Sequence, residues 1–120
     1  MSTELLGIAR FRFREGRRDD FLRLSEQARA LVLAEEPDTL QYDVYLNADQ
    51  TEALVIERYR NSEAAIWHAE HIGPMFGAVF ETVELLHGEL VGEPSEELRK
   101  NLEGNDPPTM FLPYWKPAAG

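Results

Sequence analysis

The sequence predicts an α+β fold in which two strand–helix–strand units form one four-stranded antiparallel sheet, the split βαβ or ferredoxin-like arrangement. Two observations predict it. Four segments alternate apolar and polar residues or are short apolar runs between turn residues, whereas two longer segments place apolar residues at helical spacing. These segments follow the order strand, helix, strand, strand, helix, strand, and a chain of 120 residues is one domain on length alone.

The first strand and helix are predicted from two different periods. Residues 6–13 alternate, so that Phe11 lies on one face of a half-buried strand and Arg12 on the other. Apolar residues then recur at helical spacing from Phe21 onward. Because a residue before proline disfavours helical backbone, Pro37 ends this helix at about residue 35.

The middle of the chain predicts a β-hairpin. Residues 40–47 and 53–59 both alternate, and the short segment between them, Asn47-Ala-Asp-Gln, consists of residues that favour turns. A second helix is expected from residue 63, with Asn61 or Ser62 as its N-cap.

The second half of the domain contains two further predicted boundaries. We expect the second helix to be interrupted at Gly73-Pro74, because proline fits the first turn of a helix better than its interior. A fourth strand is predicted over residues 87–91, and a short helix from about residue 94 completes a domain of residues 1–104.

Residues 105–120 form a separate extended tail. The tail holds four of the seven prolines together with several aromatic residues, so it cannot be a regular central strand. We expect it to pack on the domain or on a partner subunit, since an apolar extended segment has little order of its own.

Composition excludes several functional classes. The 22 acidic residues outnumber the 12 basic ones, and a net charge of −10 argues against binding to nucleic acid or to anionic membranes. No apolar segment approaches the length of a membrane span, and the N-terminus lacks the pattern of a secretory signal, so we expect a cytoplasmic protein. The chain has no cysteine, which excludes disulfides and thiolate chemistry.

The predicted sheet favours a homodimer. Two helices cover only one of its faces, and the other face would expose apolar side chains over several strands, more than a soluble monomer tolerates. Contact between the open sheet faces of two copies would bury these side chains.

Several segments together carry a family resemblance. They are Phe11-Arg-Phe-Arg-Glu-Gly, Leu40-Gln-Tyr-Asp-Val-Tyr, Glu57-Arg-Tyr-Arg-Asn-Ser-Glu-Ala-Ala and His68-Ala-Glu-His-Ile-Gly-Pro. With them, residues 6–92 resemble the antibiotic biosynthesis monooxygenase superfamily. The resemblance implies a dimeric α+β barrel, often with a pocket between sheet and helices. It does not imply a substrate, because the quinol oxygenases, polyketide oxidases and heme-degrading enzymes of the superfamily all resemble one another.

A histidine pair on the second helix is the main candidate for chemistry. Trp67, His68 and His71 fall within five residues, and the two histidines share a face because they are three residues apart. Imidazole exchanges a proton near neutral pH, which suits a general base for an acidic phenol or quinol. By resemblance, His68 falls on the position of the family's helix histidine. The alternative is that these side chains only cover the edge of the core.

We therefore predict His68 as the catalytic base, with Arg10 or Arg12 steadying the anion that forms. The predicted substrate-binding residues are ring-bearing side chains on the strands and the second helix: Tyr42, Tyr59, Trp67, His71, Phe76 and Phe80. Each of them also has a purely structural explanation as a packing residue.

Neither a metal nor a cofactor is expected. A metal site would need a third ligand, but Glu70 does not share the face of His68, and His87 lies on another element. No glycine-rich dinucleotide motif is present. The resemblance associates heme degradation with an asparagine on the first strand, and residues 6–13 contain none.

The function favoured by these observations is a cofactor-independent monooxygenase acting on a quinol or a polycyclic phenol. Two alternatives stay open: a non-catalytic dimer that binds a small aromatic molecule, and a non-oxidative relative of the isomerase type. The sequence leaves undecided whether the protein is an enzyme.

Overall fold

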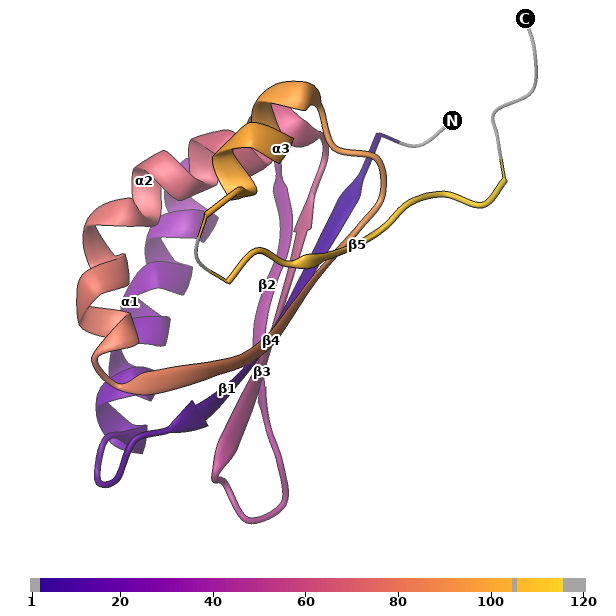
Figure 1. Cartoon of the computed structure of the whole chain (residues 1–120). Coiled ribbons are helices and arrows are strands. Elements are labelled where there is room, and N and C mark those ends of the chain that lie inside the picture. Colours follow the sequence, from indigo (N-terminus) through magenta and orange to yellow (C-terminus); the bar gives the residue numbers. More distant parts are fainter. Residues whose placement is uncertain (1–2, 105, 116–120) are drawn as a thin grey trace, which may run out of the picture.

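The computed structural model describes residues 3–104 and 106–115 and shows an α+β domain (Figure 1). Its elements are β1 (Leu5–Phe13), α1 (Arg18–Glu35), β2 (Thr39–Leu46), β3 (Glu52–Tyr59), α2 (Ser62–Phe80), β4 (Val83–Val91), α3 (Glu96–Leu102) and β5 (Thr109–Phe111). The first six follow the predicted order, so the ferredoxin-like fold is confirmed. No helix of the described residues is long and apolar enough to cross a membrane.

The sheet has five strands in the order β2-β3-β1-β4-β5, so the prediction of a four-stranded sheet was wrong. The added strand, β5, pairs parallel with β4 through residues 109–111 and lies at the edge. Pro107, Pro108 and Pro113 flank this strand and leave its own ladder positions free of proline. Of the predicted tail, residue 105 and residues 116–120 lie outside the described residues.

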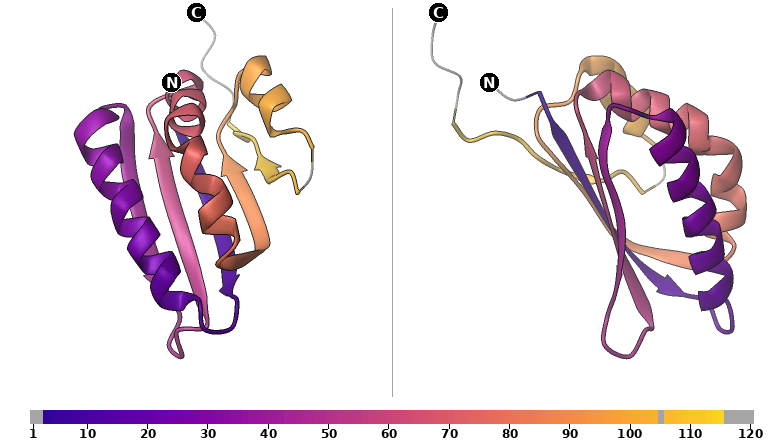
Figure 2. Two further views of the ribbon diagram at one scale, coloured as in Figure 1. Left: turned by 90° about the vertical axis from the view of Figure 1, so that its left-hand side faces the viewer. Right: turned by 180° about the vertical axis from the view of Figure 1, so that it is seen from behind.

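Helices α1 and α2 lie side by side on one face of the sheet (Figure 2). The strand side chains that face them form the core, in which Phe11, Ala53, Val55 and Val83 pack around Phe21 of α1. No helix of the described part of the chain lies over the opposite face of the sheet (Figure 2). Alternation along the strands therefore separates a covered face from an open one.

Strand β4 begins at Val83, four residues before the predicted start. A register shift opposite Arg10 and Phe11 of β1 changes which residues of β4 face the helices. Before the shift Leu85 lies opposite Phe11, and after it Leu90 lies opposite Gly7. Odd-numbered residues of β4 before the shift and even-numbered residues after it therefore lie on the same face of the sheet. A strict two-residue period could not reveal this strand's first half.

Helix α2 is continuous through Pro74, so the predicted interruption was wrong. The helix begins after Asn61, one of the two predicted N-caps, whose side chain accepts a hydrogen bond from the backbone N–H of Ala64 at 2.9 Å. Ile72 and Met75 pack against α1 on either side of the proline position. Pro74 itself is exposed, so water can satisfy the carbonyl that its missing N–H leaves free.

Candidate active site

An apolar cavity of about 360 Å³ lies between the sheet, α2 and the C-terminal segment that contains α3. Its walls are mostly apolar side chains, among them Ala9, Phe11, Val55, Phe76, Phe80 and Leu90. Three polar side chains, Glu57, Tyr59 and His68, meet at one part of the wall. A largely apolar cavity with a few converging polar groups is typical of a small-molecule site.

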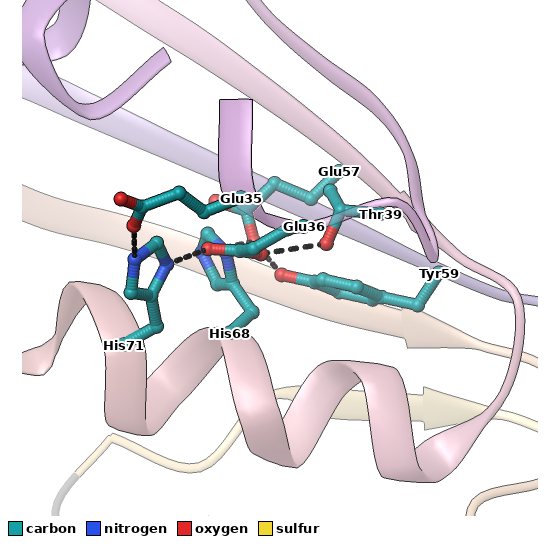
Figure 3. Close-up of polar contacts among 7 residues, drawn as sticks. All are labelled: Glu35, Glu36, Thr39, Glu57, Tyr59, His68 and His71. Carbon is teal, nitrogen blue, oxygen red and sulfur yellow. Dashed lines mark hydrogen bonds and ion pairs between the residues drawn. The ribbon is translucent and has the colours of Figure 1, made fainter. Parts of the chain in front are cut away.

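Glu36, directly after α1, is the centre of the polar network beside the cavity (Figure 3). Its side chain is only 4% exposed. Its carboxylate accepts hydrogen bonds from His68 Nδ1 at 2.8 Å, from Thr39 Oγ1 at 2.7 Å and from His71 Nδ1 at 2.5 Å. These three donors replace the water that the buried carboxylate has lost.

The same contacts keep Glu36 ionised. Burial acts to raise the pKa of its carboxyl, but the hydrogen bonds from His71, Thr39 and His68 together hold that pKa below its ordinary value. An ionised carboxylate can only accept hydrogen bonds, so the facing Nδ1 atoms of both histidines carry protons.

His68 is buried on α2 and points toward the sheet. Because its Nδ1 donates to Glu36, the neutral imidazole has its lone pair on Nε2. This second nitrogen lies 3.7 Å from Glu57 Oε2. The rings of Tyr42 and Tyr59 flank the imidazole, with centroids 5.8 and 5.5 Å away. The network therefore fixes both the orientation and the tautomer of a histidine on the cavity wall.

Glu57 and Tyr59 come from successive inward-facing positions of β3. The Tyr59 hydroxyl donates a hydrogen bond to the Glu57 carboxylate (Figure 3). Burial, and then the negative charge of Glu57, raise the pKa of Tyr59 well above its ordinary value. Burial likewise raises the pKa of Tyr42. Both phenols thus remain protonated, and Tyr59 acts as a donor that holds Glu57 in place.

His71 lies one turn further along α2, on the outer side of the network. Its Nδ1 faces Glu36 and its Nε2 faces Glu35, so both ring nitrogens donate to carboxylates. The hydrogen bond to Glu36 is the main reason that the pKa of His71 is raised above its ordinary value. The ring of Trp67 meets the imidazole edge-on, with centroids 4.4 Å apart. His71 is therefore a charged structural partner of Glu36.

We expect the stability of the fold to decrease above pH 6.5 because of His71. Its pKa is raised on folding, so its contribution is complete below the ordinary value of 6.5 and is lost as the pH rises through the folded value. Glu36 behaves in the opposite way: its contribution is present above 4.5 and is lost as the pH falls through its lowered value. The two contributions overlap between these ordinary values.

Urea unfolding at pH 6 and at pH 8 tests this expectation. The variant His71→Asn keeps a side-chain donor near Glu36 but cannot titrate, so it should lose less stability between the two pH values than the unmodified protein. An equal loss in both proteins would show that His71 is not the group responsible.

The structure brings together only part of the predicted site. Tyr59, Phe76 and Phe80 line the cavity with His68, whereas Tyr42, Trp67 and His71 are absent from its lining. Tyr42 packs against the ring of His68 from within the core, and Trp67 and His71 lie on the far side of the Glu36 network.

Arg10 and Arg12 lie on the open face of the sheet. Alternation along β1 turns them away from the side chains that pack under the helices. Arg10 Nε lies 3.4 Å from Glu52, and Arg12 Nη1 lies 3.9 Å from Glu84. Within one chain the structure does not bring either arginine to the cavity, and their predicted role in steadying an anion gains no support from it.

Sequence analysis did not propose Glu36 or Glu57 as site residues, although Glu57 begins one of the segments that carry the family resemblance. For Glu57 a signal existed, because it is a charged residue at an inward position of β3, between Val55 and Tyr59. No periodic signal marked Glu36, which follows the last residue of α1 and precedes Pro37. In the part of the chain that the structure describes, no group of three or more histidines and carboxylates has the arrangement of a metal site.

The fold and this cavity define a class of protein: a small ferredoxin-like α+β domain with a ligand-sized pocket between its sheet and its second helix. Residues 6–81, more than half of the chain, match the family model described as antibiotic biosynthesis monooxygenase, and the chain belongs to this family. No curated protein matches the chain in sequence.

Solved structures are similar in fold over most of the chain. MupZ from Pseudomonas fluorescens is 17% identical, with 99% of this chain and 91% of MupZ covered and a TM-score of 0.79. Rv0793 from Mycobacterium tuberculosis is 25% identical, with 78% and 97% covered and a TM-score of 0.66. A mutant of SnoaB, a cofactor-independent oxygenase from Streptomyces nogalater, is 16% identical, with 74% and 91% covered and a TM-score of 0.64.

Proposed function

We propose that this protein is a cofactor-independent monooxygenase of a neutral quinol or polycyclic phenol, with His68 as the base. One observation carries the proposal: an imidazole with its tautomer fixed by a buried carboxylate lies on the wall of an apolar cavity of about 360 Å³. The family and the likeness to SnoaB, described as a cofactor-independent oxygenase, support the same class of reaction.

The chemistry requires little from the protein beyond proton transfer. His68 Nε2 takes a proton from the phenolic O–H, or from the acidic C–H of a keto tautomer such as anthrone, and the resulting anion supplies electrons to molecular oxygen. For an anthrone-type substrate, one oxygen atom becomes the new ring carbonyl and the other leaves as water, so no external reductant is needed. The carboxylate of Glu36 stabilises the imidazolium that forms, as the carboxylate does in other His–carboxylate pairs.

The cavity suits a flat and uncharged ring system. Phe11 and Phe76 both contact Phe80, with ring centroids 6.0 and 6.4 Å apart, and form an aromatic wall. Among the described residues that line the cavity, none is a lysine or an arginine, whereas three are acidic. A phosphorylated or carboxylated substrate would therefore meet like charges, which disfavours its binding.

Oxygen consumption under air tests the proposal. Anthrone-type and menadiol-type compounds should raise oxygen uptake above the rate in buffer, and the anthrone product should carry one atom from ¹⁸O₂. Product formed without oxygen uptake would favour the non-oxidative alternative. Thermal stabilisation by the same compounds without any product would favour the non-catalytic binding dimer.

We also propose that two copies associate through the open face of the sheet. Ile8 of β1 pairs there with Ile56 of β3, and Leu6 and Leu54 lie on the same face of these two strands. Residues 112–115 also run outward, away from the helices (Figure 1). Burial of this apolar surface by a second copy would stabilise the pair.

Light scattering at micromolar concentration should then give about twice the chain mass of 13.7 kDa. Replacing Ile56 by glutamate should shift the population toward the monomer, because a charge would have to be buried in the contact. A single-chain mass for the unmodified protein would exclude the dimer.

A further inference from the structure

The cavity wall holds a second proton-transfer group beside His68. Glu57 lines the same cavity, and its Oε2 lies 3.7 Å from His68 Nε2. Its side chain is 26% exposed, against 5% for His68. Glu57 can therefore reach both the imidazole and a molecule bound in the cavity.

The two carboxylates beside His68 differ in what they can contact. Glu36 accepts the hydrogen bond from Nδ1, its side chain is 4% exposed, and it is absent from the cavity lining. It can therefore act on a substrate only through the imidazole. Glu57 faces Nε2, the nitrogen that would exchange the proton, and is held by the Tyr59 hydroxyl. Only Glu57 is placed to exchange a proton with both Nε2 and the substrate.

We propose that Glu57 is a second catalytic residue and that, together with His68, it catalyses the enolisation of neutral cyclic ketones without oxygen. This inference rests on the proposed function, because it uses the same base and its substrates are the keto tautomers of the polycyclic phenols proposed there. It adds an activity that needs no oxidant.

The steps balance without a further reactant. The C–H bond that is conjugated with the carbonyl breaks, its proton goes to His68 Nε2, and its electron pair moves through the ring system to the carbonyl oxygen as an enolate. The proton on Nε2 then crosses the 3.7 Å to the carboxylate of Glu57, after a small approach of the two groups, and leaves His68 neutral again. Glu57 donates this proton to the enolate oxygen, which completes the enol and restores the carboxylate.

Hydrogen–deuterium exchange at the methylene carbon of anthrone, in D₂O without oxygen, measures this activity directly. The unmodified protein should accelerate exchange over buffer, and Glu57→Gln should reduce the acceleration by about 10²–10⁴-fold. The glutamine can still accept the hydrogen bond from Tyr59. Glu84→Gln is the matched control: it removes the same charge from a side chain that is 59% exposed on the open sheet face, and it should exchange at the full rate.

The pH profile of exchange by the unmodified protein provides a test that needs no variant. Two coupled groups should give a profile with two ionisations. A single ionisation, no exchange above buffer, or full exchange by Glu57→Gln would each overturn the inference. Oxygen uptake under air separates the two proposals. Exchange without uptake retains the enolisation site and refutes the oxygenase. Uptake together with exchange that Glu57→Gln leaves unchanged retains the oxygenase and refutes the role of Glu57.

Discussion

His68→Asn is expected to reduce oxygen uptake with an anthrone-type substrate by about 10²–10⁴-fold, the usual contribution of a positioned base. Asparagine can place an N–H near the position of Nδ1 and so keep a donor toward Glu36, but it has no group at the position of Nε2. The variant thus removes the proposed proton acceptor while it preserves the contact that holds the buried carboxylate.

A matched histidine on β4 provides the control for this experiment. His87→Asn makes the same substitution at a half-exposed position whose Nε2 lies 3.5 Å from Glu89, and His87 is absent from the cavity lining. Its uptake rate should equal that of the unmodified protein. Full activity of His68→Asn, with a melting temperature close to that of the control, would remove His68 from the mechanism.

The largest expected effect on stability is that of Glu36→Ala, which should lower the free energy of unfolding by about 3–5 kcal/mol. The substitution leaves His68, His71 and Thr39 without the acceptor that all three share. A buried donor without a partner destabilises the folded state, because it has lost its hydrogen bond to water and forms none within the protein. Such a loss is a large part of the ordinary stability of a small domain, about 5–15 kcal/mol.

The preceding residue is the natural control. The Glu35 side chain is 53% exposed and pairs with His71, so Glu35→Ala should cost less than about 1 kcal/mol. Urea unfolding of both variants at pH 6 compares them under conditions in which His71 is charged. Similar losses in the two variants would mean that the shared acceptor is not what stabilises this part of the fold.

Several features of the site follow from local spacing and were predictable. The alternation of β1 separates Arg10 and Arg12 from the core-facing phenylalanines, and the helical period places His68 and His71 on one face of α2. Both patterns depend only on the backbone geometry of a single element. The inward position of Glu57 was predictable in the same way, but its chemical role depends on the side chains that face it from other elements.

Other features depend on contacts between distant segments and could not be predicted from spacing. The register shift in β4 exists only against β1, and α2 passes through Pro74 because both of its halves pack on other elements. Strand β5 forms only because an edge of β4 is available to pair with it.

The sequence by itself determined the order of the elements, the α+β class, the acidic composition and the candidate base His68, because periodicity, turn residues and charge are properties of short segments. Only the tertiary structure decided which groups act on that base. Glu36 meets His68 across 32 positions of sequence, and Glu57 approaches it from a neighbouring layer, through the packing of α2 on α1 and the sheet. The choice of partners for a buried polar group depends on this three-dimensional packing, which no local pattern encodes.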